Sequence, residues 1–229
     1  RKAKLCAAAI ALLYTVKSIK TTLPFNSVNV RTLPFRSFNW MSMMSASFTI
    51  AGSTPTYVNM YLVNTPELGI NAATAGLIVA VYWALMMVGR FVGASIGSKV
   101  SSRAMITTVS SATLVLVLFG MFAPTDVTVS VPGIDWANLS VIWAQVPVGI
   151  FAFLLVGLCS SVMWGGIFNM AVEGLGKYTA VASGIFMTMV FGCAVMLAIQ
   201  AQVAEMTDYM TSYWVVVFCA VYLLFYALV

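Results

Sequence analysis

The sequence contains no histidine and very few charged residues. Charged side chains make up 7% of the 229 residues, and hydrophobic residues make up 62%. A soluble domain typically carries about 25% charged and roughly 45–50% apolar residues. A soluble core of this size has no room for so much apolar surface. The shortage of charge therefore excludes a soluble globular domain and predicts an integral membrane protein.

Catalytic and metal-binding chemistry also lacks its usual residues. Without histidine there is no Ser-His-Asp arrangement. The four cysteines, Cys6, Cys159, Cys193 and Cys219, lie within apolar runs and do not have metal-ligand spacing. Cysteines in such runs are typical small packing residues. The sequence therefore predicts a protein that is not an enzyme and has no metal or other cofactor.

The net charge of +5 does not indicate a nucleic-acid partner. The charged residues lie in short clusters between apolar runs, which is the pattern of loops between membrane spans. The partner predicted for the apolar runs is the lipid bilayer.

Six apolar runs are long enough for transmembrane helices, which need about 20 residues to cross the hydrocarbon core. Because lipid cannot pair open backbone groups, runs this long and continuously apolar favour helices. A polar, turn-rich loop, Pro124–Ser140, separates the third run from the fourth. The predicted class is an all-α polytopic membrane protein with a six-helix bundle. Its spans are Trp40–Val63, Ala72–Ser95, Ala104–Ala123, Val141–Asn169, Val181–Gln202 and Ser212–Val229.

The charges separate by side if these six spans alternate in direction. The one exception is Glu173, which has Lys177 one helical turn away as a partner. By the positive-inside rule, both ends of the bundle face the cytoplasm. The basic residues of the cytoplasmic side are Arg31, Arg36, Arg90, Lys99, Arg103 and Lys177, and the acidic residues of the other side are Glu67, Asp126, Asp135, Glu205 and Asp208.

Residues 1–39 are predicted to lie outside the bundle of residues 40–229. The apolar run Leu5–Val16 would make about 18 Å of helix, which is too short to cross the membrane. Basic residues flank it on both sides. This pattern predicts a basic interfacial segment, or the remnant of a preceding span, followed by a linker.

Three glycines, Gly89, Gly93 and Gly97, are spaced four residues apart in the stretch GRFVGASIGSKVSSRA. Neither phosphate-binding spacing, G-x-x-x-x-G-K-[ST] or G-x-G-x-x-G, occurs there. In a membrane helix this spacing forms a stripe of small residues that lets another helix approach closely. We expect the stripe to bring the second and third spans together and to help close a cytoplasmic gate. Arg90 would lie where the helix leaves the membrane, and Arg103 in a basic turn.

Two motifs carry a resemblance to a known family. The segment YWALMMVGRFVG, Tyr82–Gly93, resembles the Y-W-x-x-x-M-x-G-R-F-x-G pattern of the fucose:proton symporter family of the major facilitator superfamily. The segment SSVMWGGIFNMAVEGLGKYTAVASG, Ser160–Gly184, is similar to that family's segment around I-F-x-x-x-x-x-G-L-G-K-x-T. The resemblance implies the C-terminal six-helix half of a transporter of the bacterial inner membrane.

The same resemblance implies sugar:proton symport by alternating access between two six-helix halves. The partners would be a sugar, protons and the missing N-terminal half of the transporter. No Asp or Glu lies at the centre of a predicted span, and membrane proton relays depend on such carboxylates. The proton-handling residues are therefore expected in the N-terminal half, where the family has them.

Polar and aromatic residues within the spans are the candidate sugar contacts. Thr56 and Asn59 share one helical face beside Pro55, which removes a backbone hydrogen bond. A sugar ring could stack on Trp164, and the resemblance implies that Tyr82 faces the cavity. Interhelical hydrogen bonding or simple packing is the alternative role. The candidate substrate-binding residues are Thr56, Asn59, Tyr82, Ser160, Trp164 and Asn169, and the candidate packing or gating residues are Gly89, Arg90, Gly93, Gly97 and Arg103.

Two other functions remain open at this stage. One is a major facilitator transporter for another small solute, and the other is a membrane subunit that transports nothing. The residues leave open which sugar is carried and whether protons or sodium ions are coupled.

Overall fold

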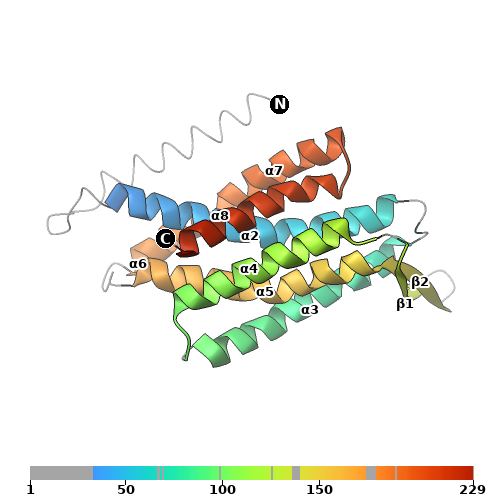
Figure 1. Cartoon of the computed structure of the whole chain (residues 1–229), viewed down its shortest axis with the longest axis horizontal. Helices are drawn as coiled ribbons and strands as arrows, with labels where there is room; N and C mark the ends of the chain where they lie inside the picture. Colours follow the sequence, from blue (N-terminus) through green and yellow to red (C-terminus); the bar gives the residue numbers. More distant parts are fainter. Residues whose placement is uncertain are drawn as a thin grey trace. The chain divides into compact units, whose positions relative to one another are not determined.

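The computed structural model describes residues 33–65, 68, 70–97, 99–124, 126–135, 140–173, 179–188 and 190–228. The chain divides into two compact units, Arg1–Asn39 and Trp40–Val229. The predicted interfacial run Leu5–Val16 lies outside the described residues. The elements, drawn in Figure 1, are α2 (Leu33–Asn64), α3 (Ala72–Gly97), α4 (Ser102–Phe122), β1 (Thr128–Asp135), β2 (Ser140–Pro147), α5 (Val148–Val172), α6 (Thr179–Thr188), α7 (Val190–Met206), η3 (Thr211–Tyr213) and α8 (Trp214–Leu228).

Four helical segments of the described chain are long and apolar enough to cross a membrane: α3, α4, α5, and η3 together with α8. Helix α2 has 32 residues and contains a proline. The fifth predicted span is covered by α6 and α7, which lie on either side of residue 189. The predicted helical membrane protein is therefore confirmed.

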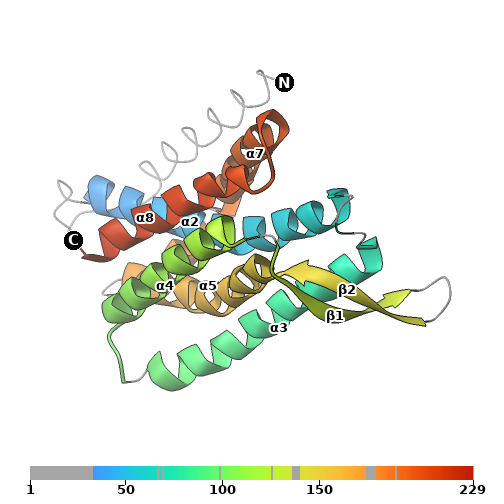
Figure 2. The ribbon, with the colours of Figure 1, turned by 45° about the vertical axis from the view of Figure 1, so that its right-hand side comes forward.

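The predicted fourth span and the loop before it are partly wrong. Residues Thr128–Asp135 and Ser140–Pro147 pair as an antiparallel hairpin, with Thr128 opposite Pro147 and Asp135 opposite Ser140. Helix α5 begins only at Val148, and Figure 2 shows the hairpin extending away from its start. A short apolar run such as 141–146 has no periodicity that separates strand from helix, so composition alone assigned it to the span.

The two faces of this hairpin have different surroundings. Gly133 is buried against the start of α3, where an added Cβ would lie 2.7 Å from Thr74 Cγ2. On the exposed face, Thr128 Oγ1 donates to Gln145 Oε1 at 3.1 Å, and Gln145 Nε2 donates to Ser130 Oγ at 2.8 Å. Gln145, which the sequence placed inside a membrane span, thus has its hydrogen bonds in the hairpin.

Helix α5 is the central helix of the described bundle. In its most apolar window 67% of the residues are buried, against 28–44% in the other three candidate spans. It packs between α3 and α4 (Figures 1 and 2), and α4 also packs on α8. A helix that is apolar on all sides is expected at such a position.

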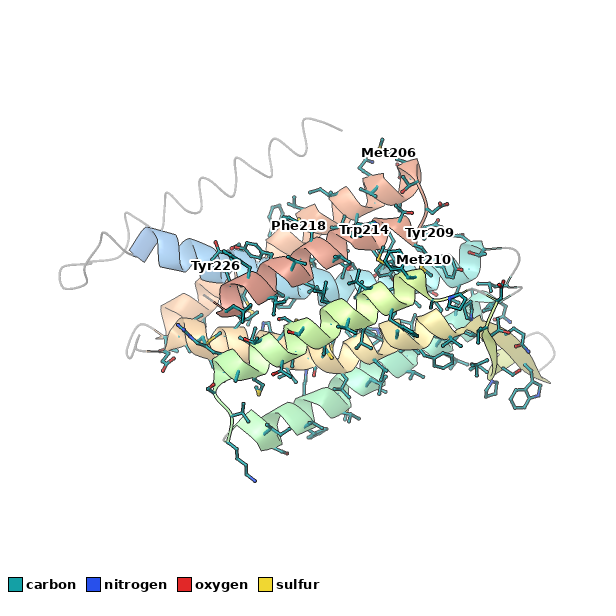
Figure 3. All side chains as sticks on the ribbon, viewed as in Figure 1. Met206, Tyr209, Met210, Trp214, Phe218 and Tyr226 are labelled. Atoms are coloured by element: carbon teal, nitrogen blue, oxygen red, sulfur yellow. The ribbon has the colours of Figure 1, made fainter. Side chains whose placement is uncertain are left out.

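The outer face of α8 carries exposed apolar side chains about one helical turn apart. Figure 3 shows two of them, Trp214 and Phe218, on this helix. Such a stripe faces lipid in a membrane protein. Its members are Trp214, Phe218, Val221, Phe225 and Leu228.

The glycine stripe of α3 packs on α5 and not on α4, so the predicted pairing of the second and third spans is wrong. A Cβ at Gly89 would lie 2.6 Å from the Leu158 carbonyl oxygen, and one at Gly93 would lie 3.0 Å from Val162 Cγ2. A Cβ at Gly97 would have no atom of the described residues within 4 Å. Because α5 occupies the centre of the bundle, it takes the place expected for α4. The two helices touch closely at the first two glycines and not at the third.

This packing predicts different effects of alanine at Gly89 and Gly97. Gly89→Ala should lower the thermal unfolding midpoint in detergent, because the new carbon would meet a backbone oxygen that cannot rotate away. Gly97→Ala is the matched control in the same helix. Gly97 is the last residue of α3, and an added Cβ there would meet no described atom within 4 Å, so the midpoint of that variant should stay unchanged. Equal shifts in the two variants would contradict the close approach of α3 to α5.

Candidate functional site

The candidate site is built around a proline in the middle of α2. Pro55 lies inside this helix and has no amide hydrogen, so the carbonyl of Ala51, four residues earlier, loses its helical donor. The Tyr82 hydroxyl, from α3, donates to this carbonyl oxygen at 3.1 Å. A side chain from a neighbouring helix thus replaces the missing backbone donor.

Tyr82 and Ser160 lie together in the packed junction of α2, α3 and α5. Their hydroxyls are 3.2 Å apart, and the Ser160 hydroxyl also donates to the Gly157 carbonyl at 3.1 Å. Both side chains are buried, Tyr82 completely. Gly157 makes room for the ring, because a Cβ there would lie 2.9 Å from Tyr82 Cδ2. Tyr82 therefore faces helices in this structure, and the predicted sugar contacts of both residues stay predictions.

Thr56 and Asn59 lie on an exposed face of α2, directly after Pro55. The Thr56 hydroxyl donates to the Gly52 carbonyl at 2.8 Å, which leaves its oxygen free to accept. Gly52 itself faces α7, with an added Cβ 3.7 Å from Cys193 Sγ. Thr56 and Asn59, which the sequence predicts on one helical face, are thus both accessible to a ligand.

Trp164 presents a ring and a hydrogen-bond donor on α5. Its indole stacks on Phe168, with ring centroids 5.6 Å apart and planes 13° apart. Its Nε1 atom is buried and has no hydrogen-bond partner among the described residues. Beside it, an added Cβ at Gly165 would meet no atom within 4 Å in the part of the chain that the structure describes. Asn169 lies farther along the helix with an exposed side chain.

The basic residues of the predicted gate are exposed. Arg90 lies within α3, which continues to Gly97; its predicted place where the helix leaves the membrane stays a prediction. Arg103 lies in the first turn of α4. Lys177, the predicted partner of Glu173, lies outside the described residues.

The chain was compared with known protein families and with curated proteins. No family model matches the chain. The glucose/galactose transporter of Brucella abortus biovar 1 (strain 9-941) is 24% identical over 177 residues, which cover 77% of this chain and 38% of that protein. The putative glucose/galactose transporter of Helicobacter pylori (strain J99 / ATCC 700824) is 25% identical over 166 residues, 70% of this chain and 36% of that protein.

A solved structure gives the fold directly. The major facilitator superfamily transporter FucP, in its outward conformation, matches 96% of this chain with a TM-score of 0.68 and 18% identity. The chain has a major facilitator fold. It covers 51% of that structure and well under half of the two curated relatives. The predicted resemblance to this superfamily is confirmed.

Within this major facilitator fold, the sequence did not identify Tyr213 as a partner of α2. Its hydroxyl donates to the Thr54 carbonyl at 2.9 Å, close to the proline. Pro55 in an apolar span does signal an orphaned carbonyl that needs a donor. The signal does not say which tyrosine supplies it, because the donors come from elements far away in the sequence.

One buried hydroxyl beside Pro55 is unpaired. Ser53 is fully buried, and its Oγ atom has no hydrogen-bond partner among the residues the structure describes. A buried polar group without a partner costs about 1–3 kcal/mol. Ser53 therefore destabilises the arrangement seen here.

Ser53→Ala is expected to raise the thermal unfolding midpoint, because it removes the unpaired hydroxyl and introduces a better helix former. Ser160→Ala is the matched control of the same residue type, equally buried but hydrogen-bonded to Tyr82. Its midpoint should fall. A fall in both variants would contradict the assignment of Ser53 as unpaired.

Proposed function

We propose that this chain forms the C-terminal six-helix half of a secondary transporter that carries a sugar. The main support is the fold match to FucP over 96% of the chain and 51% of that structure. Both curated relatives described above are named as glucose/galactose transporters. Transporters of this superfamily move solutes by rocking two halves about a central site.

The proposed sugar contacts are the exposed polar face of α2 and the aromatic pair of α5. A sugar presents hydroxyl groups, which need both donors and acceptors, and ring faces that stack on aromatic side chains. Thr56 and Asn59 supply exposed polar groups. Trp164 supplies a ring and a donor, Nε1, which is buried and unpaired within the described chain, so a sugar would reach this donor only after a local movement of the side chains around it. These two elements therefore offer the chemistry that a sugar requires.

We assign proton coupling to the other half of the transporter, which is the proposed partner of this chain. In the described helices the acidic side chains are at the ends: Glu173 caps α5, and Glu205 lies in the last turn of α7. A proton relay needs carboxylates at membrane depth. The basic residues Arg90 and Arg103 mark the proposed cytoplasmic side of a bacterial inner membrane.

The glycine stripe is the proposed gate. Gly89 and Gly93 are in contact with α5, while the end of α3 at Gly97 is not. Movement of this end toward α5 would close the side that carries Arg90 and Arg103. Small residues make such an approach possible without side-chain clashes.

The sugar site predicts a selective effect of Trp164→Phe. This change keeps a ring that stacks on Phe168 but removes the Nε1 donor. The loss of one hydrogen bond to the sugar should weaken binding roughly 10-fold. The thermal unfolding midpoint should not fall, because the donor that is removed is buried and unpaired within the described chain. The measurement is binding and proteoliposome uptake of radiolabelled glucose, galactose and fucose by the full-length transporter.

Trp143→Phe is the matched control, because this exposed tryptophan lies in the hairpin and outside the proposed site. Its sugar binding should equal that of the unmodified protein. Unchanged affinity in Trp164→Phe would remove Trp164 from the site. If the unmodified protein neither binds nor takes up any of these sugars, the proposed sugar transport is wrong.

A further inference from the structure

Two tyrosines from different elements hydrogen-bond to α2 at its proline. Tyr82, from α3, donates to the Ala51 carbonyl, which Pro55 leaves without a backbone donor. Tyr213, from η3, donates to the Thr54 carbonyl, immediately before the proline. Both side chains are 0% exposed. In an apolar bundle these two phenols are placed where the helical ladder is weakest.

The Tyr213 hydroxyl lies beside an intact step of the α2 ladder. In a regular helix the Val58 amide donates to the Thr54 carbonyl, and the Tyr213 hydroxyl donates to the same carbonyl oxygen. A side chain inserted at this step is a known cause of helix bending. The Tyr213 ring is held by stacking on Phe153 of α5, with centroids 4.3 Å apart and planes 26° apart.

The two bonds differ in what they replace. Tyr82 supplies a donor that the chain lacks, since Ala51 has no amide partner at position 55. Tyr213 adds a contact to a carbonyl whose own amide partner, Val58, is present. Replacing Pro55 should therefore make the hydrogen bond from Tyr82 less important for the stability of α2. The contribution of the hydrogen bond from Tyr213 should stay the same.

We propose that Tyr82 and Tyr213 are positioning residues that hold α2 at Pro55, so that Thr56 and Asn59 are presented on its exposed face. The consequence for sugar binding rests on the proposed function. The proposed role of the two tyrosines needs no contact with the sugar, because both are fully buried here and their hydroxyls are bonded to α2. They act on binding by fixing the segment that begins directly after the proline.

The first test is a thermal double-mutant cycle in the purified full-length transporter. Tyr82→Phe should lower the unfolding midpoint by about 4 °C. In a Pro55→Ala background the same change should lower it by less than half as much, because the new amide can donate to Ala51. Tyr213→Phe is the matched control, and its shift should be the same in both backgrounds. Equal shifts for Tyr82→Phe in both backgrounds, or equal rescue of both tyrosine variants, would overturn the proposal.

The second test separates positioning from stability by measuring galactose and glucose affinity in the same variants. The double variant Pro55→Ala/Tyr82→Phe should regain the thermal midpoint and still bind sugar several-fold more weakly, since neither the proline nor the Tyr82 hydroxyl then fixes the segment that carries Thr56 and Asn59. Recovery of affinity together with stability would show a structural role alone and overturn the positioning role. If Tyr82→Phe alone does not fold, a folded double variant supports the replacement of the missing amide, and an unfolded one contradicts it.

Failure of the proposed function gives a different result. If the unmodified protein binds neither sugar, the assignment as a sugar transporter falls. The thermal cycle then still decides whether the two tyrosines hold α2 at Pro55, because its readout does not depend on a ligand.

Discussion

The bundle depends on one requirement of the lipid phase, that every backbone carbonyl within it find a donor inside the protein. Pro55 breaks this rule at Ala51, and the Tyr82 hydroxyl restores it. That single bond joins α2 to α3, and the Ser160 hydroxyl of α5 lies 3.2 Å from the Tyr82 hydroxyl. A local defect in one helix has therefore become the point at which three helices are held together.

The same junction explains why α5 is the central helix. Its glycines and serines let α3 approach on one side, since Gly157 accepts the Tyr82 ring and Ser161 lies against Gly89. One helical turn before Gly157, Phe153 stacks on Tyr213 at the start of the last span. Helix α5 thus contacts Tyr82 and Tyr213, the donors of the two hydrogen bonds to α2. Its burial follows from these contacts more than from its hydropathy, which matches that of α3 and α4.

Sequence-based predictions were correct for features that depend on local composition. They were wrong where a feature depends on contacts with residues far away in the sequence. Runs of apolar residues identified the helices, and two motifs identified the fold, because both signals are contained in contiguous segments. The strand at 141–147 was missed because an apolar run of that length suits either structure. The partner of the Gly89 stripe was assigned to α4, its neighbour in sequence, whereas the contact is with α5. A stripe of small residues indicates that another helix packs closely there, but it does not identify which helix.

The polar residues of the candidate site show the same division. From sequence, Tyr82, Ser160, Thr56 and Asn59 were equivalent polar groups in apolar spans. Burial separates them: the first two are hydrogen-bonded inside the junction, and the last two lie on an exposed face. In lipid an unpaired buried group is costly, so a transporter must use many of its polar side chains to satisfy its own backbone. The exposed face of α2 remains available for a ligand because buried tyrosines meet the needs of the helix that carries it.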